Sequence, residues 1–362
     1  MPELERCLRK THALTVPKAE AERALRTIRS LKLTDSTLQL GRTNEIVFIP
    51  LLREPSAEET HNVKAHCASA RFTQALFEER EMRPRNLFDY LRGKVPEALL
   101  STLPHSYDII GEIGIIELFG ELAPFSSIIG EGIMKINPHL RLVLKKSSQV
   151  SGTFRTREYE AIAGEGPTET VHEEFSCLFR LDVTKVYFNP RLSHERMRVA
   201  KQIKEGECVL DMFAGVGPYS ILIAKTQRVA QIYSVDINPE AFRYLKENVL
   251  LNQVADQVVP LLGDAGLLVE TKLRGTANRV IMNLPSESNK FLHAAVKALN
   301  EEGGIIHYYT FASRSDNLGE IRESVRTSIE QCGRKVDSFA FSDIIKEVAP
   351  HRVQIGMDIV VR

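Results

Sequence analysis

The sequence predicts an α/β protein in which two smaller α+β units precede a parallel, doubly wound sheet. Its 362 residues are enough for two or three domains, each with its own core. From about residue 184 onward, strand-like runs alternate with helix-like runs, which is typical of a parallel sheet covered by helices. At residues 208–220 an apolar strand passes through a glycine-rich turn into a helix, which is the usual start of such a sheet.

The composition is that of an ordinary globular protein, with 43% hydrophobic and 26% charged residues. The 47 basic and 47 acidic side chains cancel, so the net charge neither predicts nor excludes a nucleic-acid partner. The N-terminus is charged and no apolar run reaches roughly 18 residues, so we expect neither a signal peptide nor a membrane helix. The five cysteines are scattered without a C-x-x-C spacing, which indicates free thiols in the cytoplasm and no metal site.

The first unit is expected at residues 1–60. Residues 19–31 have the apolar spacing of a helix, and residues 37–40 and 45–50 have the composition of strands. Between residues 54 and 81 the chain is polar and charged, which predicts a linker with some helix.

The second unit is expected at residues 61–183. Pro96 suits the first turn of a helix, and Pro104 ends it. The strands predicted for this unit are 109–119, broken by two glycines, 140–144 and 174–180.

The third unit, residues 184–362, contains the parallel sheet and begins with a predicted helix at 195–203. Its predicted strands are 208–212, 232–235, 258–262, 279–282, 304–310, and a last antiparallel pair near 338–341 and 354–361.

The turn after the first of these strands carries the strongest functional signal. Asp211 ends the strand, and Gly215 and Gly217 let the backbone approach a ligand while the next helix offers free N–H groups. The second strand ends in Asp236, 25 residues after Asp211, where a carboxylate can accept both hydroxyl protons of a ribose. The acidic residue before the turn and the wording D-M-F-A-G-V-G favour S-adenosylmethionine over a nicotinamide cofactor. We therefore interpret this unit as a methyltransferase.

Two further strand ends complete the predicted cofactor site. Asp264 follows the strand 258–262, where it can either accept from the exocyclic amine of adenine or only cap the next helix. Asn283 can offer a donor and an acceptor to a nucleobase, although it is also an ordinary polar strand end. Its segment, N-L-P-S, differs from the N-P-P-Y of amino-group methyltransferases, which argues against an adenine or glutamine amino group as target.

The second dense signal is Y-F-N-P-R-L-S-H-E-R at residues 187–196, immediately before the first strand of the sheet. Glu195 lies in the first turn of the predicted helix, where a carboxylate commonly does no more than complement the helix dipole. Its alternative role is that of a general base, and His194 is equally available for that role.

Residues 133–157 contain six basic and no acidic side chains: Lys135, Arg141, Lys145, Lys146, Arg155 and Arg157. Such a run is usually a solvated face. Beside a methyltransferase unit it indicates a surface that contacts phosphates.

Taken together, these segments resemble the archaeal and eukaryotic tRNA (guanine-37-N1)-methyltransferase family. The likeness runs from about Leu14 over nearly the whole chain, and Y-F-N-P-R-L-S-H-E-R and N-L-P are its most specific parts. Asn189 stands where that family more often has serine. The resemblance implies tRNA as partner, S-adenosyl-L-methionine as cofactor, and a Rossmann-like class I methyltransferase domain preceded by two smaller α+β domains. The first of these domains touches the outer corner of tRNA in that family.

The resemblance also implies roles for single residues. Glu195 is then the base that removes the N1 proton of guanine, Arg155 stabilises the charge that develops on O6, and Asn283 orients the base. The chemistry agrees, because N1 carries a proton near neutral pH and must lose it to become a nucleophile. The residues expected at the substrate are Tyr187, Arg191 and Pro285. The residues expected at the cofactor are Asp211, Phe213, Gly215, Gly217, Asp236, Ile237, Asp264, Ala265 and Asn283.

Three other functions are compatible with parts of this pattern. A related tRNA enzyme of the wyosine pathway could methylate a tricyclic base or transfer the aminocarboxypropyl group of the same cofactor; retention of Glu195 and N-L-P favours methylation. A non-catalytic tRNA-binding protein would not need the complete cofactor site. A small-molecule methyltransferase would not need the about 180 residues that precede the sheet. We expect a cytoplasmic monomer without an obligate protein partner.

Overall fold

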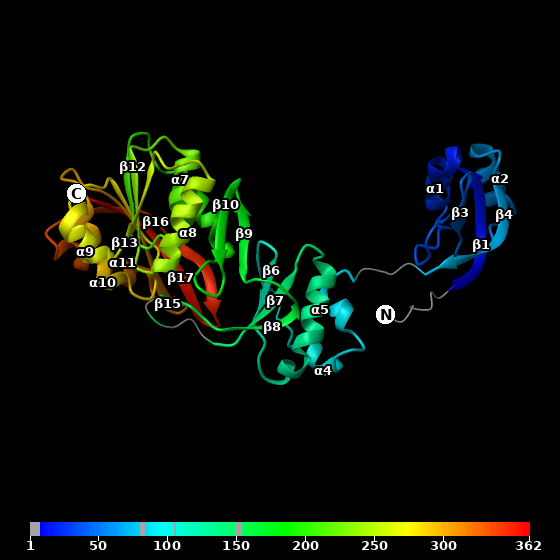
Figure 1. Ribbon diagram of the computed structural model, residues 1–362, viewed down its shortest axis with the longest axis horizontal. Coiled ribbons are helices and arrows are strands. Elements are labelled where there is room, and N and C mark those ends of the chain that lie inside the picture. The colour runs from blue at the N-terminus through cyan, green and yellow to red at the C-terminus, as the bar shows by residue number, and fades with distance from the viewer. Residues whose placement is uncertain (1–7, 80–83, 105, 149–151, 153) are drawn as a thin grey trace. The chain divides into compact units, whose positions relative to one another are not determined.

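The computed structural model describes residues 8–79, 84–104, 106–148, 152 and 154–362 (Figure 1). The chain forms two compact units, Met1–Pro84 and Arg85–Arg362. Among the described residues, no helix is both long and apolar enough to cross a membrane.

The first unit is a four-stranded antiparallel sheet in the order β2-β3-β1-β4. Its elements are β1 (Leu8–Pro17), η1 (Lys18–Glu20), α1 (Ala21–Ser30), β2 (Gly41–Arg42), β3 (Ile46–Pro50), α2 (Ala57–His66) and β4 (Arg71–Glu78). Both helices contribute to one core, in which Ile28 of α1 and Val63 of α2 are fully buried with Leu14 and Ile49 of the sheet.

The predicted linker at residues 54–81 is wrong. Ser56 and Glu59 form a reciprocal capping box that starts α2, and β4 is paired with β1 from Leu8 opposite Glu78 to Thr15 opposite Arg71. The strand tolerates polar residues because it lies at the edge of the sheet and only one of its residues, Phe77, is buried. The predicted boundary at residue 60 therefore falls inside a helix, and the predicted strand at 37–40 is reduced to one bridge between Leu38 and Glu79.

The second unit begins with a four-stranded sheet in the order β5-β6-β7-β8, in which only β6 and β7 are parallel. Its elements are α3 (Leu87–Leu91), α4 (Glu97–Leu100), β5 (Asp108–Ile110), β6 (Ile113–Ile116), η2 (Gly120–Phe125), α5 (Ser126–Ile136), β7 (Leu142–Lys146) and β8 (Tyr159–Gly164). The single strand predicted at 109–119 is a tight hairpin, because Gly111 has φ +56° and a side chain there would meet Thr170 at 2.2 Å.

A two-stranded hairpin, β9 (Glu169–Glu174) and β10 (Cys177–Asp182), follows this sheet. It packs against α8 (Pro239–Leu251), where the side chains of Asn248 and Asn252 replace a neighbouring strand. The amide of Asn252 accepts from Leu178 N–H at 2.8 Å and donates to Leu178 C=O at 2.7 Å. Asn248 makes the same pair of hydrogen bonds with Arg180, at 2.7 and 3.0 Å.

A seven-stranded sheet follows, in the order β13-β12-β11-β14-β15-β17-β16. Strands β11 to β15 are parallel, β17 is antiparallel to β15, and β16 is antiparallel to β17. The strands are β11 (Cys208–Asp211), β12 (Gln231–Asp236), β13 (Val258–Leu262), β14 (Arg279–Met282), β15 (Gly304–Ser313), β16 (Val336–Ala349) and β17 (Arg352–Val361). The helical segments are η3 (Pro190–Leu192), α6 (Ser193–Ala200), α7 (Pro218–Thr226), α8, α9 (Ala265–Leu268), η4 (Val269–Leu273), α10 (Ser288–Ala298) and α11 (Leu318–Glu330).

The sheet is buried on both faces, as the alternating strands and helices predicted. Val209 of β11 packs in a core with α7 and α8, whereas its neighbour Leu210 packs in a second core with α10 and α11. The predicted α/β fold and the antiparallel strand pair at its end are confirmed, although that pair is longer than predicted.

Candidate active site

The candidate site lies where three neighbouring strands of the seven-stranded sheet end. Asp211 ends β11, Asp236 ends β12, and Asn283 follows β14, and these strands are adjacent and parallel. Carboxyl ends of parallel strands share one edge of a sheet, which is where open α/β sheets bind ligands. The fold therefore brings together three residues that the sequence spreads over more than 70 positions.

Asp236 is half-buried and holds the loops on either side of it. One carboxylate oxygen accepts from the Gly215 N–H at 2.7 Å, and the other accepts from the Asn238 N–H at 2.9 Å. Burial raises the pKa of Asp236, and these backbone donors counteract the increase. The carboxylate is thus fixed against the glycine turn and retains an exposed part.

The two glycines of the turn have different structural roles. Gly217 has φ +93°, and a side chain there would meet Leu245 at 2.6 Å, so packing requires glycine. Gly215 has φ +56°, and the Tyr187 carbonyl oxygen, at 3.8 Å, is the only described atom within 4 Å of a side chain placed there. The protein therefore leaves the space beside Gly215 open for a ligand.

Asp211 lies beneath this turn and is fully buried. One of its oxygens accepts from the Ser220 hydroxyl at 2.9 Å, and the other has no hydrogen-bond partner among the described residues. Burial raises the pKa of Asp211 to about 7, although the Ser220 hydroxyl and the Phe213 N–H oppose this shift.

The remaining predicted cofactor residues lie on the same edge. The Asp264 carboxylate accepts from the Leu267 N–H at 2.9 Å, so it does cap α9, and Ala265 is buried behind it. Phe213 packs edge-on against Phe291, with 5.0 Å between ring centroids. Three aliphatic side chains are exposed near these strand ends: Ile237, Leu262 and Leu267.

A second group of predicted residues meets across a long sequence separation. Arg155 donates through Nη1 to the Ser286 hydroxyl at 3.0 Å, and its guanidinium lies 5.2 Å from the ring centroid of Tyr187. The Tyr187 hydroxyl accepts from the Asn189 side chain at 3.2 Å. Asn283, three residues before Ser286, is half-buried, and its side chain forms no hydrogen bond with any described residue.

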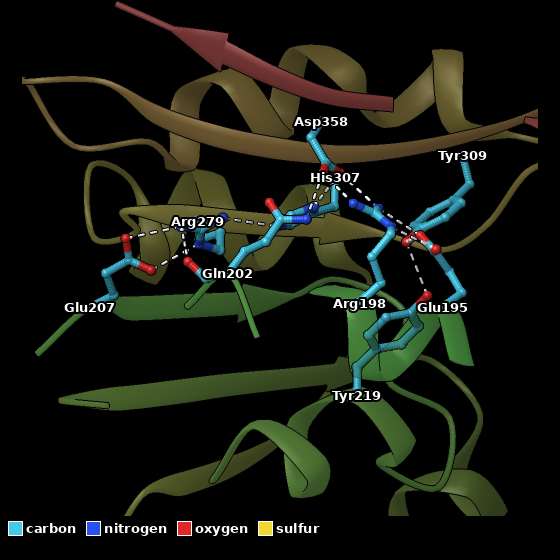
Figure 2. Close-up of polar contacts among 9 residues, drawn as sticks. All are labelled: Glu195, Arg198, Gln202, Glu207, Tyr219, Arg279, His307, Tyr309 and Asp358. Atoms are coloured by element: carbon cyan, nitrogen blue, oxygen red, sulfur yellow. Dashed lines mark hydrogen bonds and ion pairs between the residues drawn. The ribbon is translucent and has the colours of Figure 1, made fainter. Parts of the chain in front are cut away.

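Glu195 is buried in a polar network, as Figure 2 shows. Its two carboxylate oxygens accept from Nε and Nη2 of Arg198, both at 2.8 Å. The Tyr309 hydroxyl donates to the same carboxylate at 2.5 Å, and the Tyr219 hydroxyl donates to Tyr309 at 3.1 Å. The competing base, His194, is exposed and packs edge-on against the ring of Phe175.

Several members of this network were missed by the sequence analysis, although weak signals for them exist. Arg198 stands three residues after Glu195 on the predicted helix, which is the spacing of an ion pair. His307 and Tyr309 share one face of a predicted strand because they are two residues apart. Asp358 is the one charged side chain within the apolar run of residues 353–361.

Other predicted RNA-contacting residues are engaged by the protein itself. Arg191 donates to the Asp108 carboxylate at 2.6 Å and to the Ser106 hydroxyl at 3.1 Å, so it connects η3 to β5. In the basic run, Arg141 binds Glu112 together with two backbone carbonyls, Lys145 pairs with Glu160, and Lys146 pairs with Glu117. Acidic neighbours therefore partly neutralise these three residues, and the phosphate-contacting surface stays a prediction.

The described part of the chain contains no cluster of three metal-ligating side chains. Its four described cysteines, Cys67, Cys177, Cys208 and Cys332, are free thiols.

Comparison with known proteins assigns the family. The TRM5/TYW2 methyltransferase domain matches residues 170–337, and the TYW2 N-terminal domain matches residues 87–168. The tRNA (guanine(37)-N(1))-methyltransferase Trm5b of Pyrococcus abyssi is 39% identical over 348 residues, which are 96% of this chain and 98% of the relative. This chain belongs to the TRM5/TYW2 methyltransferase family. The tRNA 4-demethylwyosine(37)-methyltransferase Taw21 of Saccharolobus solfataricus is 37% identical over 70% of this chain and 92% of its own length.

Solved structures of family members have the same fold. The structure of aTrm5 in complex with tRNALeu superposes with a TM-score of 0.78 at 30% identity, and the match covers 97% of this chain and 99% of that one. Pyrococcus horikoshii TYW2 in complex with MeSAdo superposes with a TM-score of 0.64 at 28% identity, over 77% of this chain and 99% of that one.

Proposed function

We propose that this chain transfers a methyl group from S-adenosyl-L-methionine to N1 of guanine 37 in tRNA. The contact that carries this proposal is the hydrogen bond between Arg155 and Ser286. It brings a guanidinium from the basic run to the segment that follows Asn283, at the edge where Asp211 and Asp236 end their strands. The choice of substrate is supported by the 39% identical relative from Pyrococcus abyssi, which is named a tRNA (guanine(37)-N(1))-methyltransferase.

The residues at this edge fit an adenosine-containing cofactor. The exposed part of the Asp236 carboxylate suits the hydroxyls of a ribose. The exposed aliphatic side chains of Ile237, Leu262 and Leu267 suit a purine ring, and the unpaired oxygen of buried Asp211 suits an ammonium or amide donor. A related structure holds MeSAdo. When bound, S-adenosylmethionine would supply the electrophilic methyl group.

The protein's own groups would then prepare the guanine. Glu195 would accept the N1 proton; Arg198 and Tyr309 already donate to it, but a carboxylate has about four lone-pair sites and can accept a further donor. Arg155 would stabilise the negative charge that passes to O6. Asn283, whose amide has no partner within the described chain, would orient the base, and Tyr187 and Pro285 would lie beside it. Arg191 would act indirectly, through its contact with Asp108.

The proposal assigns one role to each part of the chain. The unit that ends at Pro84, rather than at residue 60, would recognise the shape of tRNA. Residues 85–183 would form a middle domain that supplies Arg155 to the active site. Residues 184–362 would form the Rossmann-like class I methyltransferase domain, because their five parallel strands and antiparallel end suit that architecture. We propose a cytoplasmic location, which suits the free thiols of the described cysteines, and a monomeric state.

A second candidate function is methylation of a tricyclic wyosine precursor at the same position of tRNA. Two observations favour it: the similarity to Taw21, and the match of residues 87–168 to the TYW2 N-terminal domain. Both substrates would use the same cofactor site, so a single enzyme could methylate both.

Methyl transfer to tRNA transcripts tests the proposal directly. With labelled cofactor and a transcript that carries guanine 37, nucleoside mass spectrometry should detect 1-methylguanosine, and a transcript with adenine 37 should remain unlabelled. Glu195→Gln should bind tRNA and cofactor but lose roughly 10²–10⁴-fold in single-turnover rate, because an amide cannot accept the proton. Arg155→Ala should also slow the transfer.

His194→Ala is the control for the identity of the base, and it should react at close to the normal rate. Near-normal transfer by Glu195→Gln together with a collapse in His194→Ala would reverse the assignment. A modest loss in both variants would mean that solvent takes the proton and that the site mainly positions the guanine. Cofactor binding without any methylated nucleoside would leave a non-catalytic tRNA-binding protein.

A further inference from the structure

The ion pair between Glu195 and Arg198 conflicts with the proposed role of Glu195 as a base. Arg198 donates to both oxygens of the Glu195 carboxylate, so its positive charge lies against the atoms that would receive the proton. It also occupies a lone pair on each oxygen, and the N1–H of guanine must compete for the remaining ones. A device that weakens the effect of Arg198 on Glu195 would therefore assist the reaction.

Asp358 provides such a device, since it binds the same guanidinium from the other side (Figure 2). Arg198 donates to the two oxygens of Asp358 at 2.5 and 3.0 Å, and the Gln202 amide donates to it at 2.8 Å. Asp358 is only 1% exposed, so water does not screen its charge. Arg198 is thus shared between two carboxylates, and the three groups together carry a net charge of about −1.

His307 holds Asp358 in place. The two residues are directly opposite each other in the register of β15 and β17, and both are buried. Nη1 of Arg279 lies 3.2 Å from Nε2 of His307, and arginine can only donate, so Nε2 is the acceptor. The proton of the neutral ring is therefore on Nδ1, which donates to Asp358 at 2.6 Å. Burial lowers the pKa of His307, in agreement with a neutral ring.

The network extends from His307 to Arg279 and Glu207, but it does not form a path for protons. Arg279 is held by the Glu207 carboxylate at 2.8 Å and by the Gln202 carbonyl oxygen at 2.9 Å. Arginine does not release a proton in proteins, and Arg279 and Arg198 each interrupt the chain of hydrogen bonds. The network therefore fixes charges and orientations.

We propose that Asp358, oriented by His307, is a positioning residue for methyl transfer: by sharing the Arg198 guanidinium it keeps Arg198 from fully neutralising the Glu195 carboxylate, which can then accept the N1 proton. This inference depends on the proposed function. The charged and titratable groups around Glu195 are Arg198 and Arg196 on α6, Tyr219 on α7, Tyr309 on β15, Asp358 on β17 and, beyond Tyr219, Asp211 on β11. Apart from Glu195, Asp358 is the acidic residue that binds the Arg198 guanidinium among the described residues, and removing its charge leaves the Glu195–Arg198 pair neutral.

The test uses the full chain, saturating S-adenosylmethionine and a tRNA transcript with guanine 37. At neutral pH, Asp358→Asn should lower the single-turnover rate on the order of 10-fold, with the affinities for cofactor and tRNA unchanged. The deficit should shrink as the pH rises, because N1 of guanine then loses its proton to solvent and a protein base is no longer needed. A defect that stays constant with pH would mean a merely structural role and would overturn the inference.

A charge-restoring double variant provides a second, independent readout. Arg198→Gln combined with Asp358→Asn returns the three groups to a net charge of about −1, with an amide still able to donate to Glu195. The double variant should react faster than Asp358→Asn alone. If Asp358→Asn does not fold, the double variant is compared with Glu195→Gln instead, because the double variant leaves no unpaired cation. The single-turnover rate of the double variant should then be clearly higher than that of Glu195→Gln. Equal rates would overturn the inference.

Asp337→Asn is the matched control. This carboxylate lies at the start of β16 and pairs with the exposed Arg362 at 3.2 Å, so its removal should leave the rate unchanged. The wild-type chain separates the two proposals: if it forms no 1-methylguanosine, both fail. If it forms 1-methylguanosine and Asp358→Asn is as fast as the wild type at neutral pH, only the role of Asp358 is refuted.

Discussion

The pKa values of two fully buried aspartates in the second unit are shifted in opposite directions, and the neighbours of each aspartate explain why. Asp358 accepts from Arg198, His307 and Gln202, and these donors keep its pKa below the ordinary value despite burial. Asp211 has only one hydroxyl and one backbone donor, so burial dominates and raises its pKa to about 7. The same side chain is thus a permanent anion at one position and a group that titrates near neutral pH at the other.

Asp211 should make the stability of the protein fall with rising pH. Its folded pKa of about 7 lies above the ordinary 3.8, so the folded state binds more protons than the unfolded state between these values. The contribution of Asp211 to the free energy of unfolding therefore decreases from near pH 3.8 to about pH 7 and is lowest above that range. Asp211→Asn cannot ionise and should not show this decrease.

Urea unfolding of both proteins across this pH range provides the measurement. The stability of Asp211→Asn relative to the wild type should increase with pH, by a few kcal/mol at most, because one pKa unit corresponds to about 1.4 kcal/mol. A difference that does not change with pH would show that Asp211 is ionised in the folded protein throughout.

At the scale of elements, the β9–β10 hairpin is attached to the sheet domain by side-chain amides. Asn248 lies in α8 and Asn252 caps the C-terminus of that helix, one turn later, so both face β10 and hydrogen bond with its backbone. Asn248 also donates to the Val216 carbonyl oxygen at 3.0 Å, within the glycine turn. One buried side chain therefore joins the hairpin, the helix and the turn of the candidate cofactor site.

Replacing Asn248 should cost more than the loss of an ordinary side chain on this helix. Asn248→Ala leaves the backbone N–H and C=O of Arg180 without these partners, which should lower the free energy of unfolding by about 1–3 kcal/mol. Leu250→Ala, on the exposed face of α8, is the control and should change it little, since Leu250 is 69% exposed. Urea unfolding distinguishes them, and equal losses would mean that water replaces the amide.

At the scale of the whole molecule, each unit has its own core and its own sheet. The structure of P. horikoshii TYW2, a relative in the same family, superposes on 77% of this chain, and the match covers 99% of that relative's chain. That relative therefore has no counterpart for about a quarter of this chain.

Residues 85–362 alone should bind S-adenosylmethionine as well as the full chain does, since the proposed cofactor residues all lie in this unit. They should discriminate less between intact tRNA and an isolated anticodon stem-loop, because the unit that we propose to recognise tRNA shape is gone. Calorimetry with the cofactor and competition between the two RNAs provide the measurements. A truncation at residue 60 is the contrasting case: it removes β1 and leaves β4 without its partner strand, so we expect aggregation. An unchanged RNA preference in residues 85–362 would show that the first unit does not recognise tRNA shape.

The sequence by itself determined the features that depend on neighbouring residues. The strand, glycine turn and helix at 208–220, the acidic end of the next strand and the N-L-P segment are local patterns, and they occur in the structure where they were predicted. Parallel strands place their carboxyl ends at one edge, so the approach of Asp211, Asp236 and Asn283 followed from the order of the strands.

Only the tertiary structure decided which distant side chains meet. Arg155 reaches Ser286 across 131 residues, and Arg198 reaches Asp358 across 160, because packing rather than local pattern brings these segments together. The same packing placed Glu112 and Glu160 beside basic residues that looked unpaired in the sequence. It also paired the polar strand at 71–78 with β1, at the edge of the sheet, where the near absence of buried residues made a strand resemble a linker. The role of a charged residue or a polar segment depends on its neighbours in space. Those neighbours come from distant parts of the chain, which no local sequence spacing connects.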